Sequence, residues 1–328
     1  MKSILALLRR REVSLVVFGI VLCAVIAIRA PRFLDPSNLQ YILNDTSILI
    51  MVALGQFLVI LIGGIDLSVA SGIALAGMIT ALVNHAAPGI PMVGIVALAL
   101  AVGLVLGAFN GLLVSVAGIP PIITTLGTLS IYRGTVFLFS GGAWVSADEM
   151  TKSYRDLPHH MVLGFTTLMI AALITFVLIA VFLRFTRTGR ELYGVGGNLT
   201  AAKYVGIKLR KVNFLPFLIS GLIVGLAGLL WVSRYASAQN DTASGFELQT
   251  IAACVIGGVS ISGGTGSAIG VVLGAVLLGI INNALTLTDI SPFWQMAIQG
   301  FVILVAIVTN TLMDRRNQRI LLARRTLV

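Results

Sequence analysis

Residues 92–114 read MVGIVALALAVGLVLGAFNGLLV and contain no charged side chain. A bilayer crossing needs about 20 predominantly apolar residues. Backbone polar groups inside lipid must be paired within the segment, so an apolar run of this length predicts a transmembrane helix. A transmembrane barrel would instead show short segments in which apolar and polar residues alternate. The stretch therefore favours a chain that crosses a membrane as helices.

Similar runs recur along the whole chain. Of its 328 residues, 58% are hydrophobic and 10% are charged, with a mean hydropathy of +1.03, whereas about a quarter of a soluble domain is charged. The expected fold class is all-α, a polytopic transmembrane helical bundle that forms one permease domain over residues 1–328, without a separate soluble catalytic domain. Charges, Pro and Gly bound about ten spans, near residues 13–30, 42–62, 72–86, 92–114, 121–140, 161–183, 213–233, 249–262, 268–286 and 293–312.

The basic residues indicate the orientation of the bundle. Most of the 22 Lys and Arg residues fall in three segments, 2–11, 184–211 and 315–325. An even number of spans puts these segments on one side, and the positive-inside rule places that side in the cytoplasm. We expect a multi-pass protein with both termini cytoplasmic. The first span is expected to be uncleaved, because no A-x-A-like site follows it.

The net charge of +10 fits the same orientation. A basic balance on a membrane protein indicates contact with anionic membrane lipid, so no nucleic-acid partner is expected. Cys23 and Cys254 lie in apolar runs, and the three histidines form no H-E-x-x-H motif, so neither a metal site nor a cofactor is predicted. The sequence has no G-x-x-x-x-G-K-[ST] phosphate loop. The chain is therefore not expected to be an enzyme, and energy from ATP would have to come from another polypeptide.

Two segments far apart in the chain echo each other. Residues 62–68 read IGGIDLS and residues 256–262 read IGGVSIS, each after a span that runs inward. Paired Gly-interrupted segments in two halves are typical of an internal repeat whose broken helices line a translocation path. The alternative is that Gly-Gly pairs are simply common in membrane helices.

A path for a small polar solute should carry uncharged hydrogen-bonding groups and scattered aromatic rings. Candidates within the spans are Gln56, Asn110, Thr124, Thr125, Trp231, Asn282, Asn283, Gln295 and Gln299. The alternative is that such side chains join helices to one another.

Three ionisable residues fall at membrane depth, Asp45, Asp66 and Arg133. Charges there are costly and usually face a cavity or each other. Asp66 follows a Gly-Gly pair, so it is expected either to line the path or to cap the helix that starts near Val69. Arg133 either pairs with Asp66 or reaches towards an interface.

The longest hydrophilic stretch is the loop at residues 186–213. Within it, Asn198 is a suitable N-cap and Gly206 a suitable terminator for a helix of about two turns. Its small face, with Ala201, Ala202 and Val205, suits docking into a groove of a partner protein. The alternative is a basic loop that rests on anionic lipid.

Several motifs together resemble the permease subunits of ribose-type ABC sugar importers, over nearly the whole chain. They lie at residues 63–68, 110–114, 120–128, 196–198, 201–202 and 252–266. The segments near Trp144 and at residues 231–235, 243–247 and 291–295 resemble the rhamnose-type branch most.

This resemblance implies a permease in the bacterial inner (plasma) membrane that passes a monosaccharide into the cytoplasm, driven by ATP hydrolysis on a separate subunit. Its implied partners are a cytoplasmic ABC ATPase, a periplasmic sugar-binding protein and a second permease subunit, identical or homologous. The loop becomes the coupling element, with Gly196, Gly197, Asn198, Ala201, Ala202 and Gly206 at the ATPase. Many relatives carry acids where this chain has Leu199 and Thr200. The alternative function, an ion-coupled secondary transporter, should carry more intramembrane acids or histidines.

Overall fold

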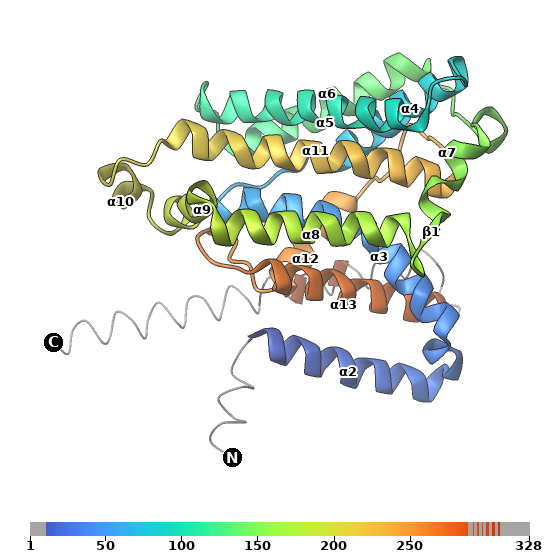
Figure 1. The fold of residues 1–328 in the computed structure, drawn as a ribbon. Helices are drawn as coiled ribbons and strands as arrows, with labels where there is room; N and C mark the ends of the chain where they lie inside the picture. The colour runs from blue at the N-terminus through green and yellow to red at the C-terminus, as the bar shows by residue number, and fades with distance from the viewer. Residues whose placement is uncertain are drawn as a thin grey trace.

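The computed structural model describes residues 11–287 and the single positions 291, 294, 297, 300, 301, 304, 305 and 308. Its long helices lie side by side (Figure 1). They are α2 (Arg11–Arg29), α3 (Pro36–Leu61), α4 (Val69–Ala86), α5 (Met92–Ser115), α6 (Pro121–Ser140), α8 (Thr167–Phe185), α11 (Leu209–Tyr235) and α13 (Ala268–Leu287).

Shorter elements connect these helices. They are η1 (Pro31–Leu34), η2 (Ala147–Glu149), α7 (Lys152–Asp156), η3 (Leu157–His159), β1 (Met161–Val162), β2 (Phe165–Thr166), α9 (Arg187–Gly197), α10 (Leu199–Tyr204) and α12 (Phe246–Ile256). Within the described residues, β structure is limited to the β1–β2 hairpin, with Met161 opposite Thr166, and one bridge between Val145 and Ala238.

Among the residues that the structure describes, eight helices are long and apolar enough to cross a membrane. They coincide with eight of the expected spans, and they confirm the all-α, polytopic fold class. The span expected near residues 249–262 differs: α12 has 11 residues and rises only about 16 Å. It stops because Gly257 and Gly258 follow, and Gly258 has a φ of +96°, which favours glycine. The span expected at residues 293–312 lies outside the residues that the structure describes continuously.

Helix α3 is the centre of the bundle. It packs against α11, α13, α8 and α12, and its residues from Thr46 to Leu61 are all buried. The outward surfaces of α5, α6 and α8 are also apolar, with Val105, Leu138 and Leu178 more than half exposed. An apolar exterior around an apolar core is what a bundle surrounded by lipid requires.

Helices α5 and α11 make the closest long contact. Gly103 and Gly107 of α5 face Gly221 and Gly225 of α11, and a Cβ added at Gly103 would overlap the Gly221 carbonyl oxygen. In lipid, small residues allow two backbones to approach this closely and to gain packing contacts. This contact fixes α11, which carries one wall of the site below.

The two ends of the bundle differ in charge. Helices α9 and α10 lie at one end, and α7 with β1 lies at the other (Figure 1). The α10 end carries the basic residues of the central loop, among them Arg187, Lys208 and Lys211. The α7 end carries acids that include Asp148 and Asp156. This separation is the one that the positive-inside argument uses.

Candidate functional site

Both echo segments are breaks between helices. The first break, residues 62–68, joins α3 to α4, and the second break, residues 257–267, joins α12 to α13. They touch, because a Cβ added at Gly263 would lie 2.7 Å from the Gly63 nitrogen. The Gly264 N–H also donates to the carbonyl of Leu61, the last residue of α3, at 2.9 Å. The end of α9 packs onto the same point, where a Cβ at Gly196 would overlap both the Leu61 oxygen and the Gly264 nitrogen. We call this contact of Leu61, Gly196 and Gly264 the glycine junction.

The first break holds a closed polar network. The Asp66 carboxylate accepts from the Ser68 N–H at 2.9 Å and from the Ser68 hydroxyl at 2.6 Å. Asn110 of α5 donates to the same hydroxyl at 2.8 Å. With its amide oriented to satisfy both neighbours, Gln56 donates to the Asp66 carbonyl and accepts from the Asp66 N–H, each at 3.1 Å. All four side chains are buried, so the network fixes the entry into α4.

Two threonines of α6 lie beside this network. Thr125 donates to the Ile65 carbonyl at 3.0 Å, which ties α6 to the first break. Thr124 is also buried, and its hydroxyl has no hydrogen-bond partner in the described part of the chain. Asn283 has a different place: it exchanges two amide hydrogen bonds with Asn38, at 2.9 and 3.0 Å, and so joins α13 to α3.

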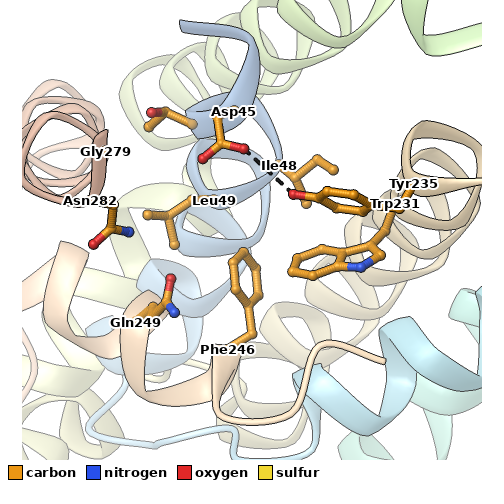
Figure 2. Close-up of a pocket in the computed structure, with 10 residues that line it drawn as sticks. Asp45, Ile48, Leu49, Trp231, Tyr235, Phe246, Gln249, Gly279 and Asn282 are labelled. Carbon is orange, nitrogen blue, oxygen red and sulfur yellow. Dashed lines mark hydrogen bonds between the residues drawn. The ribbon is translucent and has the colours of Figure 1, made fainter. Parts of the chain in front are cut away.

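A cavity of about 200 Å³ opens in the half of the bundle that faces the α7 end. We call it the aromatic pocket. Its lining residues belong to four helices, α3, α11, α12 and α13 (Figure 2). Its lining residues are Asp45, Thr46, Ile48, Leu49, Trp231, Tyr235, Phe246, Gln249, Gly279 and Asn282.

Three aromatic rings form one side of the pocket. Phe246 meets Trp231 edge to face, with ring centroids 4.8 Å apart. Tyr235 stands one helical turn beyond Trp231, at 5.5 Å. Opposite them, Figure 2 shows the amides of Gln249 and Asn282 and the carboxylate of Asp45 around the same space. Apolar ring faces beside a few polar groups are the composition of a small-molecule site.

Asp45 is held from one side. The Arg234 guanidinium donates to its carboxylate at 2.9 Å and to the Asn44 carbonyl at 2.7 Å. The Tyr235 hydroxyl reaches the same carboxylate oxygen at 3.5 Å (Figure 2). The Arg234 side chain is only 7% exposed, whereas that of Asp45 is 35% exposed. The carboxylate is therefore both fixed in place and open to the pocket.

The segment at the α10 end contains the short helix that the sequence predicts. Asn198 caps α10, since its side chain accepts from the Ala201 N–H at 2.9 Å, and Gly206 follows with a φ of +78°. The two alanines face different ways: Ala201 is exposed, whereas Ala202 is 3% exposed and belongs to the core around α3. Val205 is 75% exposed. Of the three residues expected on the small face, Ala201 and Val205 are therefore exposed, whereas Ala202 is not.

Comparison with known proteins identifies the family. Residues 38–307 match the family described as branched-chain amino acid transport system / permease component. The chain belongs to this permease family. It is thus the membrane-embedded component of an ABC transporter, a multi-pass subunit that is not itself catalytic.

Individual relatives cover most of the permease. The autoinducer 2 import system permease protein LsrC of Enterobacter sp. (strain 638) is 37% identical over 304 residues, 93% of this chain and 88% of that protein. The ribose import permease protein RbsC of Escherichia coli (strain K12) is 36% identical over 295 residues, 89% and 91% of the two chains. The RbsC of Bacillus subtilis (strain 168) is 35% identical over 296 residues, 90% of each. No solved structure matches the permease.

Most of the predicted path residues fall into two groups, and Asn283, which joins α13 to α3, belongs to neither. Gln56, Asp66, Asn110, Thr124 and Thr125 gather at the first break, whereas Trp231 and Asn282 line the aromatic pocket. Gln295 and Gln299 lie outside the described residues. Whether either group lines the path stays a prediction.

Sequence reasoning left several pocket residues unassigned. It did not place Asp45, Tyr235, Phe246 or Gln249 in a site. The available signal was the spacing of Trp231 and Tyr235, because residues four positions apart lie on the same face of a helix. The suggested Asp66–Arg133 pair is wrong, because Arg133 donates instead to two backbone carbonyls near α12.

Proposed function

We propose that this permease is the pore-forming subunit of an importer that carries a monosaccharide into the cytoplasm, and that the aromatic pocket binds the sugar on its way. ATP hydrolysis would take place on a separate cytoplasmic ABC ATPase. The single observation that carries the proposal is the pocket wall, where aromatic rings at Trp231 and Phe246 stand opposite Asp45, Gln249 and Asn282.

The chemistry of the wall fits a sugar. A sugar ring presents C–H groups on its faces and hydroxyls at its rim. The aromatic rings offer apolar surfaces for the faces, and the carboxylate and the two amides offer acceptors and donors for the hydroxyls. Displacing ordered water from such groups is favourable only when the solute replaces the hydrogen bonds, which a polyhydroxylated solute does.

The type of sugar follows from the segments that build the wall. Trp231 and Tyr235 belong to residues 231–235, and Phe246 belongs to residues 243–247. These are two of the segments that resemble the rhamnose-type branch, and both contribute to the pocket. The relatives are named for ribose and for autoinducer 2 import. We therefore place L-rhamnose first and D-ribose second among the candidate solutes.

The proposed assembly follows the same division of ends. The ATPase would dock at the α10 end, through α9 and α10, and a periplasmic sugar-binding protein at the α7 end. A second permease subunit, identical or homologous, would complete the pore, and membrane lipid would cover the apolar outer surface. In this arrangement both termini would lie on the cytoplasmic side of a bacterial inner membrane. A reporter fused after Val328 should behave as cytoplasmic and one inserted near Asp148 as external.

The test is reconstitution of the permease in proteoliposomes with an ABC ATPase and a periplasmic binding protein from the same organism. L-rhamnose, D-ribose and L-leucine are then compared for stimulation of ATP hydrolysis and for uptake. L-leucine is included because the family description names branched-chain amino acids. We expect a sugar to stimulate both activities. Stimulation by L-leucine alone would overturn the proposal.

A further inference from the structure

The connection between α11 and α12 has no regular structure, although it lies against the pocket. It spans residues 236–245, and Ala236, Ala243 and Gly245 all have positive φ values, of +47°, +58° and +82°. Backbone groups without a helix partner are costly in an apolar surrounding unless other groups satisfy them. Part of this requirement is met locally: Thr242 and Ser244 N–H groups donate to the Gln239 and Asp241 carbonyls, and Ala238 pairs with Val145. The Asn240 and Thr242 carbonyls accept from another helix, so the connection is also held from outside itself.

Helix α6 supplies that hold. Nη1 of Arg133 donates to the Asn240 carbonyl at 2.8 Å and to the Thr242 carbonyl at 3.0 Å. At the last residue of α6, the Ser140 hydroxyl donates to the Asn240 side chain at 2.8 Å. Asn240 in turn donates to the Gly142 carbonyl at 2.9 Å. A cation that serves two carbonyls makes the stronger kind of hydrogen bond.

The held segment leads directly into the pocket wall. The Phe246 N–H donates to the Ala243 carbonyl at 3.0 Å, so the position of residues 240–243 sets where α12 begins. Phe246 is the first residue of α12 and meets Trp231 edge to face, and Gln249 lies one turn further along. Arg133 itself does not line the pocket. Its influence on the pocket passes through the backbone that it binds.

We propose that Arg133 is a positioning residue of the transport path: by binding the carbonyls of Asn240 and Thr242, it fixes Phe246 and Gln249 in the wall of the aromatic pocket. The role in transport rests on the proposed function, whereas the effect on the wall does not. Arg133 also interacts electrostatically with Glu247 and Asp241, so a test must separate the carbonyl bonds from charge balance.

The test uses the full-length permease with Trp231 as its own probe, after Trp144→Phe and Trp294→Phe. Arg133→Met removes all donors. Arg133→Lys retains the charge and a donor, and Arg133→Met with Glu247→Gln removes the charge imbalance. Arg29→Met is the matched control, because Arg29 is an exposed arginine in α2. Two quantities are measured: quenching of Trp231 fluorescence by acrylamide, and the L-rhamnose or D-ribose concentration that half-maximally stimulates ATP hydrolysis in the reconstituted assembly.

Arg133→Met should make Trp231 more accessible to acrylamide and raise the half-maximal sugar concentration roughly tenfold, the scale of a lost hydrogen bond to a charged group. The unstimulated hydrolysis rate should stay that of the Arg29→Met assembly. Arg133→Lys should recover part of both changes, and the double variant should not recover them. If Arg133→Met does not accumulate, Asn240→Ala, which removes the Ser140 and Gly142 contacts, should shift both quantities in the same direction.

The outcomes separate the inference from the proposed function. Trp231 quenching and a half-maximal concentration equal to those of the Arg29→Met control would overturn the role of Arg133. Full recovery in the double variant would also overturn it, because charge balance alone would then explain the effect. If no sugar stimulates even the parent assembly, the proposed function fails, and Trp231 quenching still decides whether Arg133 positions Phe246.

Discussion

The first and second breaks share a Gly-Gly pair, but the helices that lead into them differ. Helix α3 runs for 26 residues before the first break, whereas α12 runs for 11 before the second. The chain before α12 is irregular over residues 236–245, whereas α3 is helical from Pro36 onward. The two halves thus use a similar turn at the α10 end and diverge towards the α7 end.

The difference explains where the cavity lies. Around α3, backbone bonds are made within the helix, and the polar groups at its end close on each other through Asp66 and Ser68. Beside the shortened α12, part of a helix is missing, and the space next to Trp231 and Asp45 is open. Irregular backbone at membrane depth is tolerated where it is buried in protein or lines a cavity. The complete helix supports the bundle, and the shorter one leaves the space in which the proposed function would place the solute.

The largest effect should come from a change where the two breaks meet. Gly196→Ala would drive a Cβ into the Leu61 carbonyl oxygen and the Gly264 nitrogen. Both obstacles are backbone atoms that no rotamer change can move, so the cost should exceed the roughly 1–3 kcal/mol of ordinary overpacking. We expect loss of most folded permease and of sugar-stimulated ATP hydrolysis, measured by size-exclusion yield and by turnover.

Gly197→Ala is the control for this change, because a Cβ there meets nothing within 4 Å. It should keep parental yield. If Gly196→Ala and Gly197→Ala behave alike, the glycine junction does not join the two breaks to α9.

The next effect should separate the two alanines of α10. Ala201 is exposed and Ala202 is 3% exposed. Ala201→Arg should keep permease yield, because Arg is a good helix former, while an unpaired charge in a docking face lowers ATPase co-purification about tenfold or more. Ala202→Arg should lower the yield of the permease itself. Equal ATPase recovery in Ala201→Arg and the parent would show that the ATPase does not dock on this face.

The contrast between the halves also marks what the sequence could predict. Eight apolar runs, both Gly-Gly breaks and the Asn198 cap are local signals, and each is present in the structure. The span predicted near residues 249–262 is too long, because the apolar run continues past Gly257 whereas the helix ends at Ile256. The pocket could not be predicted, since it needs faces of four helices from residues 45 to 282 to converge. Likewise, the exposure of Ala201 and the burial of Ala202 depend on how α10 packs against the core.

A moderate effect is expected in the aromatic pocket. Asp45→Asn removes the charge that faces the pocket and leaves the nearly buried Arg234 without its ion-pair partner. We expect the half-maximal sugar concentration to rise roughly tenfold, the scale of a lost hydrogen bond to a charged group. The measurement is sugar-stimulated ATP hydrolysis in proteoliposomes. Asp35→Asn, at an exposed acid ahead of α3, is the control. If the sugar binds elsewhere, neither Asp45→Asn nor Asp35→Asn should change the half-maximal sugar concentration.

The smallest effect is expected at the first break, from Asp66→Asn. The carboxylate uses one oxygen to accept from both Ser68 groups, and an Asn side-chain oxygen can accept the same two bonds. The network loses charge and keeps its shape, so uptake should change by no more than about threefold, within the range of one neutral hydrogen bond. Ser68→Ala is the sharper structural change, because it removes the hydroxyl that joins Asp66 to Asn110, and it should lower thermal stability more than Asp66→Asn does. Loss of uptake in Asp66→Asn at normal membrane levels would mean that the charge itself acts in transport. Asp66 would then line the path, which is one of the two roles expected from the sequence. The first break would then be part of the path, and the contrast between a supporting first break and a solute-binding aromatic pocket would fail.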